Sequence, residues 1–289
     1  MRQLEYEFKE MLRNNRDGSY GTQVQRKASL LRIARDLREL GFNQMNVHAL
    51  KRKHVIALVK HWQELGISAG SQKNLLVFVR WWARKVGKYD LLPEENDSLR
   101  IPKRSLIPDS SKAQYLNQDI LNQISDERIR LSIELQQEFG LRRQESLLFQ
   151  PSYADQQDHL AMKGSWTKGG RPRTIPLITE CQRVLVDRTR KIAGGGSMIP
   201  SQLSYKQWFD RYISELKKQN LYNLHGLRHG YAQRRYRMLT GWPSPFENGP
   251  KFNDMTEELR KIDEHARLQV SQELGHNRIS ITDVYLGKR

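Results

Sequence analysis

Cysteine is almost absent from this chain of 289 residues, which contains only Cys181. A single thiol excludes an intrachain disulfide and a zinc site built on cysteine pairs, and it fits a reducing compartment. The chain also lacks an apolar run long enough to cross a membrane, and its first residues lack the apolar stretch of a secretory signal. We therefore expect a soluble cytoplasmic protein without a membrane partner.

Positive charge, by contrast, is abundant. Lysine and arginine number 49 against 32 aspartates and glutamates, a formal net charge of +17. Residues 1–110 carry 21 basic and 12 acidic side chains, and residues 111–289 carry 28 and 20, so both parts are basic. The basic residues are interleaved with leucine, isoleucine, valine and tryptophan rather than gathered in a polar tail. This pattern indicates a folded protein that binds a polyanion.

Apolar residues recur at helical spacing through the first part of the chain. The spacing predicts helices over residues 22–40, 47–65 and 71–86, each followed by a glycine that can cap it. Residues 93–112 then place Pro93, Pro102 and Pro108 among charged residues and serines, a composition that breaks helices. We predict an all-helical domain over residues 1–92, a linker over 93–112 and a second domain over 113–289.

The second domain combines helical patterns with one short region that has the pattern of β-strands. Helices are predicted over residues 117–139 (as one or two helices), 179–192, 205–218, 224–239, 256–274 and 279–286. Between the first two of these, the segments 159–166 and 172–178 flank Lys168, Gly169 and Gly170. Adjacent glycines permit the positive φ angles of a tight connection, so we predict a β-hairpin with Lys168 at its tip. The predicted fold class is mainly α with a small β-sheet, an α+β second domain.

An ordered series of polar residues runs through this second domain. It comprises Arg142, Glu145, Lys168, His225, Arg228, His276 and Tyr285. The residue types suit attack on a phosphodiester. A tyrosine hydroxyl is a weak nucleophile at neutral pH and needs a base or a positive field, which histidines and arginines supply.

Each member of the series has a chemical reason to be there. Two guanidinium groups, those of Arg142 and Arg228, can hold the oxygens that gain negative charge during attack. The departing hydroxyl needs a general acid, for which Lys168 is the candidate. Glu145, one turn after Arg142, can orient a basic side chain. No acidic set resembles a two-magnesium site, so we expect chemistry without metal or other cofactor.

In this order the motifs resemble the active site of tyrosine recombinases of the phage-integrase type, a match that covers about residues 110–289. The resemblance implies that Arg142, Lys168, His225, Arg228 and His276 activate Tyr285 as the nucleophile, with Glu145 at the family's acidic position. It implies a SAM-like helical core-binding domain and a catalytic domain that clamp around double-stranded DNA. It also implies 3′-phosphotyrosyl intermediates formed without ATP or metal.

The resemblance further implies a homotetramer on DNA, built as two dimers from protomers that are monomeric in solution, and accessory DNA-bending or directionality factors. We expect an integrase of a prophage or other mobile element, acting in the bacterial cytoplasm at the nucleoid. Three alternatives stay open: a DNA-binding architectural or regulatory protein that has lost catalysis, a relaxing enzyme like type IB topoisomerases, and a chromosome-dimer resolvase.

Candidate DNA contacts lie in both domains. Lys73, Arg80, Arg84 and Lys88 follow one another at intervals of seven, four and four, which places them on one stripe of the 71–86 helix and its extension. A solvated helix face is an equally good interpretation of that stripe. Arg171, beside the hairpin glycines, is a further candidate.

Four other features bear on packing and assembly. We expect Trp81 and Trp82 to be core or helix-contact residues and His229 to be a core histidine. The proline-containing 240–258 segment is longer than relatives usually carry and is either a surface loop or a contact for DNA or a partner. The four residues after Tyr285 are too few for a C-terminal helix that reaches a neighbouring protomer.

Overall fold

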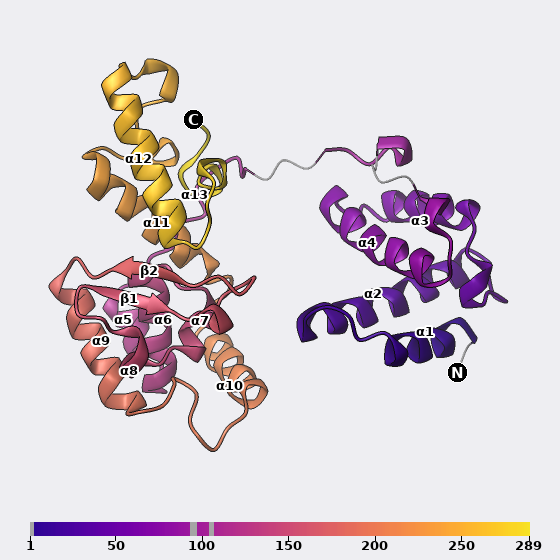
Figure 1. Cartoon of the computed structure of the whole chain (residues 1–289), viewed down its shortest axis with the longest axis horizontal. Coiled ribbons are helices and arrows are strands. Elements are labelled where there is room, and N and C mark those ends of the chain that lie inside the picture. Colours follow the sequence, from indigo (N-terminus) through magenta and orange to yellow (C-terminus); the bar gives the residue numbers. More distant parts are fainter. Residues whose placement is uncertain (1–2, 93–96, 104–106) are drawn as a thin grey trace. The chain divides into compact units, whose positions relative to one another are not determined.

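A computed structural model describes residues 3–92, 97–103 and 107–289 of the chain. The chain divides into two compact units, Met1–Ser105 and Leu106–Arg289 (Figure 1). Of the predicted 93–112 linker, residues 93–96, which include Pro93, and residues 104–106 lie outside the described residues. Within the described ranges, no helix is both long and apolar enough to cross a membrane.

All regular elements among the described residues of the first unit are helices. Its α-helices are α1 (Gln3–Asn14), α2 (Tyr20–Glu39), α3 (Arg52–Glu64) and α4 (Ala69–Lys85), and short 3-10 turns cover Val47–Ala49, Tyr89–Leu91 and Asp97–Leu99. The α1 helix was not predicted. The predicted 47–65 helix is wrong at its start, because the Asn46 side chain caps a separate 3-10 turn and Leu50 and Lys51 are extended before α3 begins.

Aromatic side chains form the centre of the first unit. Phe8 of α1 meets Trp82 of α4 edge-on, with ring centroids 4.7 Å apart, and both side chains are fully buried. The indole of Trp82 donates to the Val47 carbonyl. Trp81, on the neighbouring face, donates to Asp17 and packs under the Arg26 guanidinium. Both tryptophans therefore have core or helix-contact roles, as predicted.

The second unit is built mainly of helices. Its α-helices are α5 (Gln118–Asn122), α6 (Glu127–Phe139), α7 (Arg143–Leu148), α8 (Pro151–Ala154), α9 (Glu180–Ala193), α10 (Tyr205–Lys218), α11 (His225–Thr240), α12 (Glu257–Glu273) and α13 (Asp283–Leu286). The predicted 279–286 helix is in fact a 3-10 turn, Ile279–Ile281, followed by the single turn of α13. The α6 and α11 helices contact each other, and α11 also contacts α12 and α13 (Figure 1).

The predicted hairpin is confirmed. Strands β1 (His159–Met162) and β2 (Arg173–Pro176) pair antiparallel, with His159 opposite Pro176 and Met162 opposite Arg173. Gly169 and Gly170 in the connection have φ angles of 84° and 71°, which L residues with side chains rarely adopt. The chain as a whole is mainly helical with this small sheet, as the sequence predicts.

The α11 helix is buried along most of its length. Its glycines permit this, because a Cβ at Gly226 would lie 2.5 Å from the Gln114 side chain and one at Gly230 would lie 2.7 Å from the Gln114 carbonyl oxygen. The extended segment before α5 therefore packs directly on the α11 backbone. This close packing fixes the first turns of α11, which carry His225, Arg228 and His229.

Candidate active site

Arg142 is placed by the end of one helix and the start of the next. Gly140 caps α6 in the left-handed conformation, with φ 60°, and Arg142 is the extended N-cap residue of α7. A Cβ at Gly140 would lie only 2.6 Å from Tyr231 Cδ1, so this turn needs glycine for both its conformation and its packing. The sequence Gly-Leu-Arg thereby turns the Arg142 side chain back toward α12.

Glu145 is a buried carboxylate that holds two arginines. It accepts hydrogen bonds from Arg142 Nη1 at 2.7 Å and from Arg173 Nη1 and Nη2 at 3.1 and 2.7 Å. Burial alone would raise its pKa, but the hydrogen bonds and charge of Arg173, together with Arg228 and Arg142, lower the pKa of Glu145 to about 2. It is therefore ionised at neutral pH, and it fixes the direction of both guanidinium groups.

Arg228 is fully buried between backbone carbonyls and the Tyr285 hydroxyl. Its Nη1 donates to the Gly140 carbonyl at 2.5 Å, its Nη2 donates to the Leu274 carbonyl, and its Nε lies 3.4 Å from Tyr285 Oη. Burial and the nearby charges of Arg142 and Arg173 lower the pKa of Arg228 to about 10, although the neighbouring Tyr285 opposes that shift. Arg228 remains a cation at neutral pH in a rigid orientation.

His276 is positioned by the way α12 ends. Gly275, with φ 72°, follows the last helical turn, and the His276 amide donates back to the Ser271 carbonyl at 2.8 Å. This is the Schellman termination of a helix, which turns the following residue across the helix end. His276 Nε2 thereby lies 3.4 Å from Arg142 Nη2. Burial, with the charges of Arg228, Arg142 and Arg173, lowers the pKa of His276 to about 4, so its imidazole is neutral at pH 7.

Tyr285 on α13 is nearly buried and is surrounded by three imidazole rings. The ring centroids of His229, His225 and His276 lie 4.7, 6.4 and 6.4 Å from that of Tyr285. His229 was expected to be a core histidine, and it is indeed buried, but it is the ring closest to Tyr285 of the three. Its Nδ1 is buried without a hydrogen-bond partner among the described residues.

The two neighbouring histidines of α11 are both shifted toward the neutral form. Burial lowers the pKa of His229 to about 4, with help from His225. Partial withdrawal from water and the charges of Arg228 and Arg142 also lower the pKa of His225, whose ring still reaches solvent. Neutral imidazoles can accept a proton, so the Tyr285 hydroxyl has candidate bases around it.

The structure thus brings together Arg142, Glu145, His225, Arg228, His276 and Tyr285. Lys168 and Arg171 lie in the exposed connection between β1 and β2, and across the described ranges no hydrogen bond or ion pair joins Lys168 to that cluster. Arg173 was missed by sequence reasoning. The sequence Arg171-Pro172-Arg173 shows a second basic residue beside the hairpin connection, but nothing in the sequence indicates that the Arg173 guanidinium pairs with Glu145.

The candidate DNA contacts on the first unit form a shorter stripe than predicted. Lys73, Arg80 and Arg84 lie on α4, where Arg84 is exposed. Because α4 ends at Lys85, Lys88 does not continue the helical stripe. Its Nζ donates to the carbonyls of His48 and Leu50 at 2.5 and 2.7 Å, so its charge stabilises the turn before α3.

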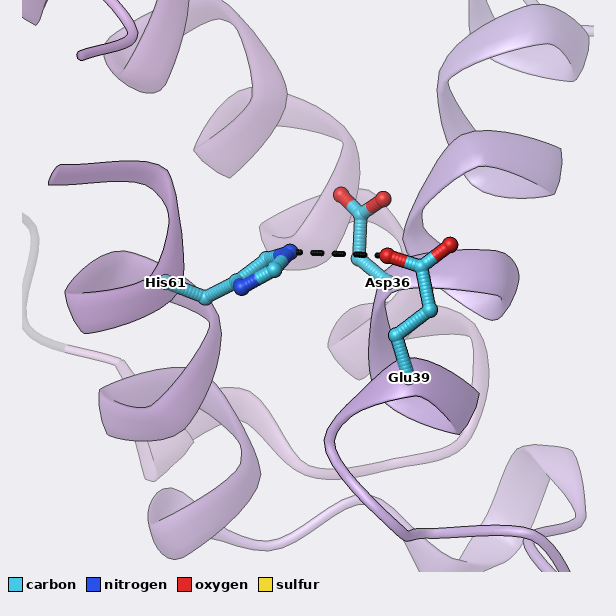
Figure 2. A group of neighbouring side chains, drawn as sticks. All are labelled: Asp36, Glu39 and His61. Carbon is cyan, nitrogen blue, oxygen red and sulfur yellow. Dashed lines mark ion pairs between the residues drawn. The ribbon is translucent and has the colours of Figure 1, made fainter. Parts of the chain in front are cut away.

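A separate group in the first unit has the residue types of a metal site. Asp36 and Glu39 of α2 and His61 of α3 offer ligand atoms that lie within 4.8 Å of one another (Figure 2). His61 Nε2 is 3.7 Å from Glu39 Oε2, the ion pair drawn in Figure 2. Asp36 is already engaged, since it accepts from the Trp62 indole at 2.8 Å and lies 3.6 Å from Arg32 Nε. We interpret the group as an ion pair and a core hydrogen bond that join α2 to α3.

Family models match both parts of the chain. Residues 1–92 match the model described as phage integrase, N-terminal, and residues 101–234 match the model described as integrase. The chain belongs to the phage-integrase family of tyrosine recombinases, a class of DNA strand-exchange enzymes. The second match includes Arg142, Lys168, His225 and Arg228 and ends before His276 and Tyr285.

Solved structures share the fold across nearly the whole chain, at low sequence identity. A lambda integrase dimer bound to a COC′ core site is 18% identical, with a TM-score of 0.58, and the match covers 96% of this chain and 95% of that one. XerH site-specific recombinase bound to palindromic difH is 14% identical, with a TM-score of 0.61 and coverage of 99% and 81%. The Tn1549 transposon integrase in complex with circular intermediate DNA is 14% identical, with a TM-score of 0.54 and coverage of 100% and 96%. No curated protein matches the sequence.

Proposed function

We propose that this enzyme is a site-specific integrase in which the Tyr285 hydroxyl attacks a phosphodiester of duplex DNA. The observation that carries the proposal is the convergence on one hydroxyl: Tyr285 Oη lies 3.4 Å from the buried Arg228 guanidinium and its ring is enclosed by three histidines. A buried cation next to a tyrosine oxygen stabilises the phenolate that attack requires. Most tyrosines of a folded domain have no such surroundings.

The arginines supply the charge stabilisation. As Tyr285 attacks phosphorus, the non-bridging oxygens gain negative charge, and Arg142 and Arg228 are held beforehand by Glu145 and by backbone carbonyls. Donors that are fixed before reaction do not have to reorganise as the charge develops. Because guanidinium groups bind phosphate oxygens in pairs, the chemistry that we propose uses them in place of a metal ion.

Two proton movements complete the step. A bond forms between phosphorus and Tyr285 Oη while the bond from phosphorus to the 5′ oxygen breaks, which leaves a 3′-phosphotyrosyl enzyme. The phenol proton passes to a neutral imidazole, with His276 and His225 as the candidates. Lys168, on the exposed hairpin, protonates the departing 5′ oxygen when DNA brings the two together. The free 5′ hydroxyl of another strand can then reverse the step.

The partners follow from the charge and the family. Double-stranded DNA attachment sites are the proposed substrate, and Lys73, Arg80, Arg84 and Arg171 are proposed to face the DNA, whereas the ammonium group of Lys88 is engaged by two backbone carbonyls. Lambda integrase has been solved as a tetramer bound to a Holliday junction, and we propose a tetramer of two dimers on DNA here too, formed from protomers that are monomeric when free. The element is proposed to be a prophage or other mobile element, with accessory bending or directionality factors, in the bacterial cytoplasm.

The test is whether the protein forms a covalent adduct with DNA. The purified protein is incubated with EDTA on labelled nicked duplexes from the ends of its own genetic element, where the short cleaved fragment diffuses away and traps the intermediate. We expect an adduct that survives SDS, is destroyed by protease and is absent in Tyr285→Phe, while duplex affinity is unchanged. Binding without any adduct would instead favour the catalytically silent architectural protein, and loss of the adduct in EDTA would contradict the metal-free mechanism.

A further inference from the structure

The nucleophile is carried by a very short helix. The α13 helix spans only Asp283–Leu286, and the amides of Tyr285 and Leu286 both donate to the Thr282 carbonyl. One helical turn has little stability of its own, because nucleation costs more than a single turn recovers. The position of the Tyr285 hydroxyl must therefore depend on what holds the residues on either side of it.

A buried arginine holds both sides. Arg267 of α12 is 1% exposed, and its Nη1 lies 3.0 Å from Asp283 Oδ1, 3.4 Å from Thr282 Oγ1 and 3.3 Å from the Gly287 carbonyl oxygen. These three partners lie on both sides of Tyr285 in the sequence, within three residues of it. Its Nε donates to Asp263 Oδ1 at 2.8 Å, within α12 itself. A buried charge is tolerated only when it is paired and hydrogen-bonded, so these contacts constrain one another.

The same network reaches the 240–258 segment. Asp263 Oδ1 also accepts from the Tyr236 hydroxyl of α11 at 2.7 Å, and Tyr236 in turn accepts from the Trp242 indole at 3.1 Å. The side chains of Asp263 and Tyr236 are buried. The segment is therefore tied by hydrogen bonds, through Tyr236 and Asp263, to the arginine that holds α13.

The segment also contacts the residues that follow the nucleophile. Gly287, with φ 93°, packs so closely on Pro245 and Phe246 that a Cβ would lie 3.1 and 3.0 Å from them. The Arg289 guanidinium lies 4.0 Å from the Phe252 ring centroid, and its Nε lies 3.2 Å from Asp263 Oδ2. Residues 287–289 are thus held in cis by the 240–258 segment and α12.

We propose that Arg267 is a positioning residue for the Tyr285 nucleophile and that the 240–258 segment is the cis receptor for residues 287–289. Arg267, Asp263 and the segment together form what we call the α13 clamp. The clamp holds the hydroxyl beside Arg228 without help from a second protomer. The proposal rests on the proposed function of Tyr285 and gives the 240–258 segment a role in the reaction.

The decisive variant is Asp283→Asn in the full chain, which keeps the size of the side chain and removes the charge that Arg267 binds. Two quantities are measured: amide hydrogen exchange of residues 285–287, and the single-turnover rate of adduct formation on the nicked duplex. We expect faster exchange and an adduct rate lower by about tenfold or more, because an error of about 1 Å at the nucleophile can cost a hundredfold. Duplex affinity should not change. Phe252→Ala, which removes the platform for Arg289, should produce a smaller loss of the same kind.

Arg183→Met is the matched control. Arg183 forms a bidentate pair with the buried side chain of Asp155 elsewhere in the second unit, so the variant loses an ion pair far from α13 in sequence, while Asp155 keeps its pair with Arg190. We expect a lower melting temperature but a wild-type adduct rate, which separates positioning from general stability. If Asp283→Asn exchanges faster and still forms the adduct at the wild-type rate, or if its exchange is unchanged, the clamp is refuted. If the wild-type protein itself forms no Tyr285-dependent adduct, the proposed function fails, and the clamp fails with it.

Discussion

Replacing Glu145 by glutamine should destabilise the second unit and disorder Arg142. Glutamine has nearly the same shape, but its amide nitrogen is a hydrogen-bond donor. The guanidinium groups of Arg142 and Arg173 present only donors too, so they cannot bond to that nitrogen. One side of the present arrangement, in which both carboxylate oxygens accept, is therefore lost. Two partly or fully buried cations are left short of a counter-charge.

The pKa of Glu145 gives the size of the expected loss of stability. It is held at about 2 against 4.5 for an ordinary glutamate, and about 2.5 units at about 1.4 kcal/mol each correspond to about 3 kcal/mol of stability at pH 7. Because the pKa of the carboxyl is lower in the folded state, this contribution is fully present above pH 4.5 and is lost as the pH falls toward 2. The difference between wild type and Glu145→Gln should therefore be constant from pH 7 to about 5 and shrink below that.

The assay is native-state hydrogen exchange of the α6 and α7 amides in increasing urea, which reports the opening of the second unit separately from the first. The same variant should also form the covalent adduct more slowly, because Arg142 loses the partner that directs it. A destabilisation below about 1 kcal/mol at pH 7, the size of a single ordinary hydrogen bond, would refute the argument. A difference that stayed constant down to pH 3.5 would show that ionisation of Glu145 is not its source.

Three further predictions concern the same site. Lys168→Ala should slow adduct formation on ordinary duplex but be rescued when sulfur replaces the bridging 5′ oxygen, because a thiolate leaves without a general acid; absence of rescue would assign Lys168 another role. Gly140→Ala should lower the free energy of unfolding by about 1–3 kcal/mol, since its Cβ would overlap the Tyr231 ring, whereas Gly241→Ala, with a similar positive φ and open space around it, should cost less. The imidazole of His276 should titrate near pH 4 by NMR; because its pKa is lower in the folded protein, this group should make the protein less stable as the pH falls from 6.5 toward 4. A titration near 6.5 would contradict the burial of His276 among guanidinium groups.

Much of the fold could be predicted from the sequence, where local patterns and tertiary packing agree. The α2, α4, α9, α10, α11 and α12 helices follow apolar periodicity and end within a few residues of the predicted positions. The hairpin follows from two adjacent glycines. The candidate residues for phosphodiester chemistry were chosen by their types and order, and six of the seven converge in space.

What the sequence did not reveal depends on contacts between distant residues. Arg173 pairs with a carboxylate 28 positions earlier, and Arg267 pairs with residues 15 to 20 positions later, and no local pattern marks either arrangement. Lys88 fits a helical stripe by spacing, but α4 ends at Lys85 and two backbone carbonyls bind the ammonium group instead. His229 has the burial of a core histidine, yet its ring packs against Tyr285. In each case a tertiary partner decides the role.

The distribution of charge explains why so many of these partners are backbone carbonyls. Arg142, Arg173 and Arg228 approach one another around a single carboxylate, that of Glu145, so the site has an excess of buried positive charge. Further carboxylates would relieve this excess but would also repel a phosphate. Carbonyl oxygens, such as those of Gly140 and Leu274, hold the guanidinium groups without cancelling their charge. The folded protein thus keeps a cluster of guanidinium groups with unbalanced positive charge, and under the proposed function the phosphodiester supplies the counter-charge, as transition-state stabilisation requires.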